Sequence, residues 1–131
     1  MTTQHSLYDM LGGEDAIRQL VDRFYDLMDE KDEVKTLRDL HAKNLRVSRE
    51  KLFLFLSGWF GGPDLYVQKY GHPRLRQRHF PFSISTKESD EWMLCMNQAL
   101  DEQVEDKMFA MKLKSTFDNM AQHMINQPSE P

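Results

Sequence analysis

The sequence predicts an all-α fold, and two observations carry that prediction. Apolar residues recur at steps of three and four through several long segments, which is the spacing of one face of a helix. No segment alternates apolar and polar residues as a half-buried strand does, and no internal repeat is present. With 131 residues, 40% of them hydrophobic and 29% charged, the chain has the size and composition of one soluble globular domain. We expect that domain to span residues 1–127, followed by a short tail over residues 128–131.

The first long helix is predicted from six apolar residues with helical spacing, and Tyr25 lies at the edge of the same face. The six are Ile17, Leu20, Val21, Phe24, Leu27 and Met28. From Asp29 to Asn44 the chain is charged and irregular, so we expect only a short helix or turn there. A strongly apolar helix is predicted from about Ser48 to Phe60, and it must be covered on more than one side.

The region between Asp64 and Phe82 contains too many helix breakers for one long helix. Gly71, Pro73 and Pro81 interrupt it, so we expect a loop with short helical turns. Because a proline biases the residue before it away from helical geometry, His79 is expected to end a brief helix.

Two helices are predicted toward the C-terminus. The first begins at a capping box formed by Ser85 and Glu88. Its inward face is made of Trp92, Cys95, Met96, Ala99 and Gln103. The second stops before Pro128, and its apolar face is made of Phe109, Leu113, Phe117, Met120 and Met124.

The charge balance argues against two classes of partner. Seventeen basic and twenty-one acidic residues give a net charge of −4, so nucleic acid and membrane lipid are not expected partners. Cys95 is the only cysteine, which excludes an internal disulfide and a multi-cysteine metal site. The residues from Met1 to Ser6 lack the pattern of a secretory signal, so we expect a cytoplasmic protein.

His79 is the candidate iron ligand. An imidazole nitrogen can bind haem iron, and this one lies in a stiff, apolar setting between two prolines and two phenylalanines. A single histidine beside aromatic residues is more often a packed or surface side chain, so spacing alone leaves both interpretations open.

A ligand held by haem iron also needs hydrogen-bond donors on the opposite side. A phenol, an indole and an imidazole can supply them, and the candidates are Tyr25, Trp92 and His41. Each has an ordinary alternative. Tyr25 could place its hydroxyl in water, Trp92 could pack in the core, and His41 lies in a polar stretch where surface histidines are common.

Ordered motifs along nearly the whole chain resemble the group II truncated haemoglobins. They include Tyr8, Gly12-Gly13, Phe24-Tyr25 and Phe60-Gly61-Gly62-Pro63. The most specific block is Gly71-His72-Pro73-Arg74-Leu75-Arg76 with Arg78-His79 and Phe82, followed by Trp92 and Cys95-Met96. This resemblance implies a truncated globin domain, a two-over-two helical sandwich around haem b, with His79 as the proximal ligand and Tyr25 and Trp92 as distal donors.

The resemblance also assigns residues around the haem. It places Ser48, Lys51, Leu52 and Phe55 along the distal helix, where the small Ser48 leaves the entrance open. Lys51, Tyr66 and Arg78 are expected to hold the propionates, because cationic and phenolic groups form charge-assisted hydrogen bonds with carboxylates. For Lys51, ordinary surface exposure is the alternative. Phe24 and Met96 could contact the porphyrin, although packing between helices explains them equally well.

The chain departs from the group's pattern in one segment. Many relatives carry a tyrosine where this sequence offers His41, and the stretch from Asp29 to His41 is slightly longer than usual. If His41 enters the pocket, a titratable donor replaces a phenol and ligand affinity changes near neutral pH.

Two functional hypotheses follow. The first is a haem protein that binds oxygen and other diatomic ligands, such as nitric oxide or carbon monoxide. Several donors should slow oxygen release, which favours redox detoxification by nitric oxide dioxygenation or peroxide reduction. Because no nucleotide-binding fingerprint is present, any reductase must be a separate protein. The second hypothesis is a cofactor-free helical interaction module, in which His79 and Trp92 only pack and the arginine-rich loop meets an acidic partner.

Overall fold

The computed structural model describes residues 6–127, and all of its regular secondary structure in that range is helical. The predicted tail over residues 128–131 lies outside the described residues. In order, the elements are α1 (Leu7–Leu11), α2 (Gly13–Glu30), the 3₁₀ turn η1 (Asp32–Val34), α3 (Lys35–Asp39), α4 (Arg46–Trp59), α5 (Leu65–Tyr70), α6 (Leu75–Arg78), α7 (Thr86–Gln103) and α8 (Lys107–His123). The all-α prediction is confirmed.

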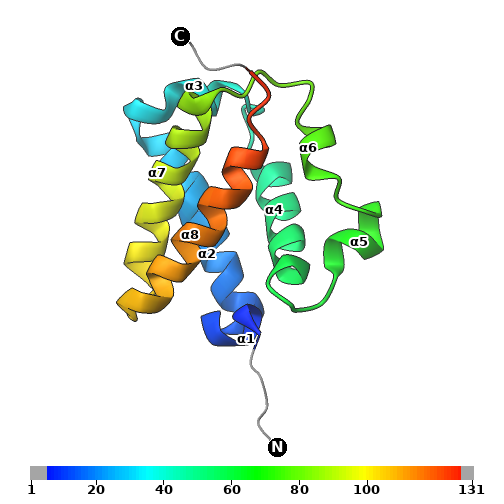
Figure 1. Ribbon diagram of the computed structural model, residues 1–131, viewed down its shortest axis with the longest axis vertical. Helices are drawn as coiled ribbons and strands as arrows, with labels where there is room; N and C mark the ends of the chain where they lie inside the picture. Colours follow the sequence, from blue (N-terminus) through cyan, green and yellow to red (C-terminus); the bar gives the residue numbers. More distant parts are fainter. Residues whose placement is uncertain (1–5, 128–131) are drawn as a thin grey trace, which may run out of the picture.

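Two pairs of long helices form the body of the domain (Figure 1). Helix α2 packs against both α4 and α7, and α7 packs in turn against α8. The pair α2–α4 therefore faces the pair α7–α8, as a two-over-two sandwich requires. Short helices α5 and α6 lie on the side of α4 away from α7, and α5 packs against α4.

The apolar stripe predicted for α2 is its buried face. All six predicted residues, from Ile17 to Met28, are at most 2% exposed. Burying a side chain of this size contributes about 1.5–3 kcal/mol to folding. The stripe thus fixes which side of α2 faces the other three long helices, and Tyr25 at its edge is only 6% exposed.

The tight turn that follows α4 is hydrogen-bonded to the N-terminal helix α1. The backbone N–H of Tyr8 donates to the carbonyl of Phe60 at 2.9 Å, and that of Gly62 donates to Ser57 at 2.8 Å. The ring of Tyr8 lies so close to Gly62 that an added Cβ would be 2.2 Å from a ring carbon. This contact explains the glycine at position 62, and a φ of +91° explains the glycine at position 61.

The segment around His79 ends a short helix and is hydrogen-bonded to the segment that follows α8. Helix α6 ends at Arg78, with His79 as its C-cap, as predicted. Asn126, beyond the end of α8, donates from its side chain to the carbonyls of His79 and Phe82 and accepts from the N–H of Ile84. The predicted capping box of Ser85 and Glu88 is also present at the start of α7.

None of the helices within residues 6–127 combines the length and the apolar character that crossing a membrane requires.

Candidate functional site

A cavity of about 550 Å³ lies among α2, α3, α4, α5, α6, α7 and the end of α8. This volume is within the range of about 300–1,000 Å³ usual for cofactor pockets. Ten of the twelve predicted site residues line it. They are Tyr25, His41, Ser48, Lys51, Leu52, Phe55, Tyr66, Arg78, His79 and Trp92.

His79 has the tautomer that an iron ligand needs. Its Nδ1 lies 2.6 Å from the carbonyl oxygen of Leu75, one helical turn earlier. Because a carbonyl can only accept, Nδ1 carries the proton, and in the neutral ring Nε2 keeps a free lone pair. A backbone carbonyl that orients the ring in this way is a common second partner of metal-binding histidines. The residue therefore fits the proximal role.

Tyr25 and Trp92 offer donors to the same cavity. Tyr25 is only 6% exposed and lines the cavity, and no hydrogen bond joins its hydroxyl to another residue within 6–127. Trp92 is half-buried and also lines the cavity, and no hydrogen bond joins its indole N–H to another of the residues described. Burial raises the pKa of Tyr25, against the opposing effect of Arg49, so the phenol keeps its proton at neutral pH. Two donors that line the cavity without protein partners fit a polar ligand inside it.

His41 presents a lone pair at neutral pH, which the sequence did not indicate. Its Nδ1 donates to the carbonyl of Leu37 at 3.0 Å, so Nε2 is the unprotonated nitrogen of the neutral ring. Burial lowers its pKa; the Leu37 bond opposes this shift, while Arg38 and His79 add to it. His41 becomes a donor at Nε2 only after it takes up a proton.

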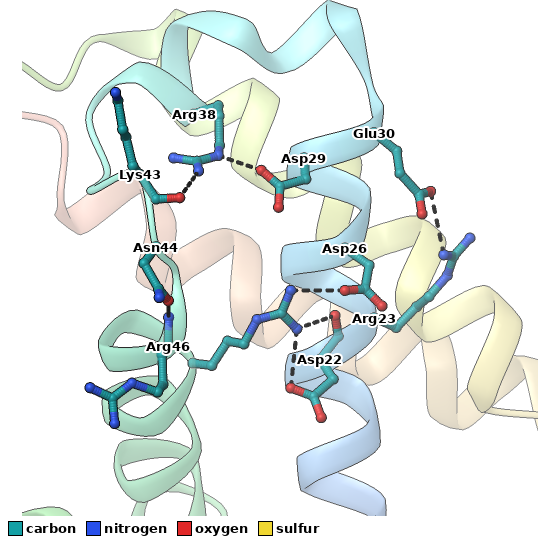
Figure 2. Close-up of polar contacts among 10 residues, drawn as sticks. Asp22, Arg23, Asp26, Asp29, Glu30, Arg38, Lys43, Asn44 and Arg46 are labelled. Atoms are coloured by element: carbon teal, nitrogen blue, oxygen red, sulfur yellow. Dashed lines mark hydrogen bonds and ion pairs between the residues drawn. The ribbon is translucent and has the colours of Figure 1, made fainter.

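An arginine clamp holds the loop that carries His41 (Figure 2). Arg38 donates to the carboxylate of Asp29 at 2.6 Å and to the carbonyls of Ala42 and Lys43 at 2.9 and 2.7 Å. Beside it, Arg49 of α4 pairs with Asp22 and Asp26 of α2, at 3.1 and 2.8 Å. The contacts of Arg38 fix the loop to α2, and those of Arg49 join α4 to the same helix. Sequence reasoning missed the clamp because charged residues in an irregular stretch carry no signal of their partners.

One face of α4 forms an apolar wall of the cavity. Ser48, Leu52 and Phe55 follow one another at steps of four and three, so they share a helix face. Phe55 is braced edge-on by Tyr66 of α5, with ring centroids 6.3 Å apart. Ser48 is the smallest of the three, so this end of the wall is the less obstructed one.

The residues expected to hold the propionates differ in how firmly other protein groups hold their side chains. They are Lys51, Tyr66 and Arg78, and all three line the cavity. The guanidinium of Arg78 donates to the carbonyl of Pro73 at 2.6 Å, with longer contacts to Tyr70 and His72. It thereby closes the loop that precedes α6. The ammonium of Lys51 lies 5.4 Å from the ring centre of Tyr70 and forms no ion pair within residues 6–127. Lys51 is thus the freer cation of the two.

Phe24 and Met96 are not among the lining residues. Both are 0% exposed. Phe24 packs against Tyr25 and Trp92, with ring centroids 4.9 Å away in each case. The structure therefore places them behind the wall of the cavity, where Phe24 supports the two donor residues.

Several lining residues were absent from the predicted site. Leu75, Phe82, Ile84, Met120 and Met124 complete its apolar surface, and Glu88 and Ser89 add polar atoms. Met120 and Met124 carried a signal, since both belong to the apolar face predicted for the last helix. Glu88 is occupied by the capping box, where its carboxylate accepts from the N–H and hydroxyl of Ser85 at 2.8 Å.

Comparison with known proteins identifies the family. The family model of the bacterial-like globins matches residues 6–126. A group 2 truncated haemoglobin of Bacillus subtilis is 35% identical over 115 residues, covering 88% of this chain and 85% of that protein. A cold-adapted truncated haemoglobin from the Antarctic bacterium Pseudoalteromonas haloplanktis superposes with a TM-score of 0.92 at 46% identity, covering 95% of this chain and all of that one. A group II 2-on-2 haemoglobin of Agrobacterium tumefaciens also gives 0.92, at 39% identity and 97% and 98% coverage.

The comparisons and the cavity agree on the cofactor. Globins hold haem through a proximal histidine, and His79 presents a free Nε2 to a cavity of suitable size. The haem-binding, two-over-two fold predicted from the sequence is confirmed. The chain belongs to the bacterial-like globin family, as a group II truncated haemoglobin with haem as its cofactor.

Proposed function

We propose that this globin holds oxygen tightly and uses it, with electrons from a separate reductant, to detoxify nitric oxide or peroxide. One observation carries the proposal. The cavity lined by His79 is also lined by Tyr25 and Trp92, and no hydrogen bond joins the hydroxyl of Tyr25 or the indole N–H of Trp92 to another of the residues described. A polar diatomic ligand can accept from both.

The residues of the chain divide the work of binding. Haem, when bound, supplies the iron at which a diatomic ligand is held. His79 provides Nε2 to that iron, and the Leu75 carbonyl keeps its ring in the required tautomer and orientation. Lys51, Tyr66 and Arg78 line the cavity, and in this proposal their cationic and phenolic groups hold the propionates.

The donors explain why slow release is expected. A hydrogen bond to a group that carries negative charge contributes about 1.5–3 kcal/mol. Oxygen held in the cavity of the haem-loaded protein would carry partial negative charge and would gain from donors such as Tyr25 and Trp92, whereas the less polar carbon monoxide would gain less. The two donors therefore favour oxygen over carbon monoxide, and retention over delivery.

Retention suits turnover. Conversion of nitric oxide and oxygen to nitrate consumes one electron, which bound haem would supply, and reduction of peroxide to two molecules of water consumes two electrons and two protons. In both cases the electrons come from outside this chain. We place the reaction in the cytoplasm, which supplies reduced carriers.

Reconstitution with haem tests the proposal. The purified chain should bind haem in a one-to-one ratio, show a strong Soret band, bind oxygen reversibly and form nitrate when nitric oxide is added to the oxygenated protein. A cofactor-free interaction module would show no stoichiometric pigment. Haem binding without nitrate formation and without peroxide consumption would reduce the proposal to oxygen binding alone.

A further inference from the structure

The charges of the chain are distributed unevenly along the sequence. Between Asp64 and Glu88 there are five cations and no acidic residue. The whole chain contains seventeen basic and twenty-one acidic residues. The remainder therefore carries twelve basic and twenty-one acidic residues, a net charge of −9. A local positive region stands on a protein that is otherwise strongly negative.

Most of these cations lie on α5, α6 and the loops beside them, residues 65–82, which we name the α5–α6 surface. Lys69, Arg74, Arg76 and Arg78 are all exposed. Every ion pair within residues 6–127 involves other cations. The positive charge of the surface is therefore not neutralised by neighbouring carboxylates.

Contacts join the members of the surface. Lys69 and Lys51 each place their ammonium 5.4 Å from the ring centre of Tyr70, and Arg78 reaches the carbonyl of the same tyrosine. The guanidinium of Arg76 lies 5.4 Å from the ring centre of Phe80. Figure 1 shows the two short helices together on one edge of the molecule.

Arg74 has a backbone conformation that glycine would adopt with less strain. Its φ is +44°, and it is the one non-glycine residue with positive φ within residues 6–127. Its side chain forms no hydrogen bond or ion pair to the described residues. Strain without a local contact to offset it is typical of residues kept for function.

Apolar side chains accompany the cations. Phe80 is 54% exposed, Val67 44% and Phe82 42%. Phe80 follows His79 directly, and Phe82 also lines the cavity. An apolar patch among like charges is suited to a small, transient protein interface of the kind that electron carriers form.

We propose that the α5–α6 surface docks an acidic protein that carries one electron on a flavin or an iron–sulfur cluster. This inference rests on the proposed function, which requires an external reductant. The reduced carrier loses one electron, the ferric haem iron gains it and becomes ferrous, and no other bond changes. The surface contains the segment that supplies the iron ligand His79, so a carrier seated there is close to the electron acceptor.

Stopped-flow reduction with a defined probe tests the proposal. The probe is a reduced plant-type [2Fe–2S] ferredoxin, an acidic one-electron carrier, and the reaction is reduction of the ferric haem protein. The rate should fall steeply as salt is raised to about 0.15 M, because exposed charges are screened over about 8 Å there. The double variant Lys69→Glu, Arg74→Glu should be slower by about tenfold or more at low salt.

Three controls make the result specific. Lys112→Glu reverses one charge on α8, far from the α5–α6 surface. Arg76 of that surface contacts α8 at the carbonyl of His123, and Lys112 lies eleven residues, or about 16 Å along the helix, from that point. This variant should react like the unaltered protein. Reduced riboflavin, a small donor that needs no protein docking surface, should reduce all the proteins at nearly the same rate. Calorimetric titration with oxidised ferredoxin should show weak, salt-sensitive binding that the double variant loses, without any electron transfer.

The outcomes separate the two proposals. Equal slowing by Lys112→Glu, or a rate independent of salt, would overturn the docking surface. So would binding to phosphatidylglycerol vesicles with no binding to ferredoxin, since the surface would then be a lipid site. If nitrate still forms with riboflavin in these cases, the proposed function stands while the docking inference fails. If ferredoxin binds but no nitrate forms and no peroxide is consumed, the docking surface is retained and the detoxification proposal fails.

Discussion

Replacing Tyr25 with phenylalanine isolates the contribution of one hydroxyl to ligand retention. Tyr25→Phe keeps the ring that packs edge-on against Phe24 at 4.9 Å. The hydroxyl that it removes belongs to a cavity-lining residue and forms no hydrogen bond within residues 6–127, so no described group loses a partner. The folded state should therefore be as stable as before, within about 0.5 kcal/mol. Any change in ligand release then reports the lost donor.

The expected size of the effect follows from the environment of the hydroxyl. Tyr25 is 6% exposed, so water competes weakly for the ligand. Losing a donor in such a place costs about 1–3 kcal/mol, which corresponds to a roughly 5- to 160-fold faster release if it is expressed wholly in dissociation. Carbon monoxide release should change less, because that ligand accepts hydrogen bonds poorly.

Stopped-flow displacement of oxygen by carbon monoxide measures the rate directly. Tyr66→Phe is the matched control, since it removes a phenol hydroxyl from α5 in the same cavity but on the edge assigned to the propionates. It should leave oxygen release close to that of the unaltered protein. An unchanged rate in Tyr25→Phe, or an equal change in both variants, would refute the reasoning.

Three further predictions test separate parts of the account. Burial lowers the pKa of His41 below its usual 6.5, so its Nε2 gains a proton only under acidic conditions; oxygen release should therefore slow as the pH falls through that lowered pKa, and His41→Gln should abolish the change. The unfolded chain takes up this proton at a higher pH than the folded one, so urea denaturation should show that the protein loses stability below pH 6.5. Gly62→Ala should lower the free energy of unfolding, measured by urea denaturation, by about 1–3 kcal/mol, because its Cβ would lie 2.2 Å from the Tyr8 ring. Added to the variant Tyr8→Ala, the same substitution should cost much less, since the ring is gone. Ser85→Ala should lower stability by about 0.5–2 kcal/mol through loss of the capping box, and an unchanged unfolding midpoint would contradict this.

Periodicity predicted the parts of the fold that depend on local pattern. The apolar stripe of α2, the capping box at Ser85 and the brief helix ending at His79 all follow from neighbours a few residues apart, and each is present. Such signals survive in a single sequence because the residues that create them are close along the chain.

Contacts between distant segments could not be predicted in this way. The clamp by which Arg38 holds the loop of His41 depends on Asp29 and on two backbone carbonyls, so charge alone did not reveal it. The structure also places Phe24 and Met96 behind the cavity wall, a distinction between two buried positions that helical spacing does not make. Tautomers are likewise invisible in sequence, and they decide that His41 presents a lone pair at neutral pH.

The central claim is that Nε2 of His79 binds the haem iron, and one measurement tests it most directly. Resonance Raman spectra of the ferrous, ligand-free His79→Gly protein should lack the iron–histidine stretching band, and added imidazole, which can enter the space left by the side chain, should restore it. Retention of that band in the variant without imidazole would show that another residue binds the iron.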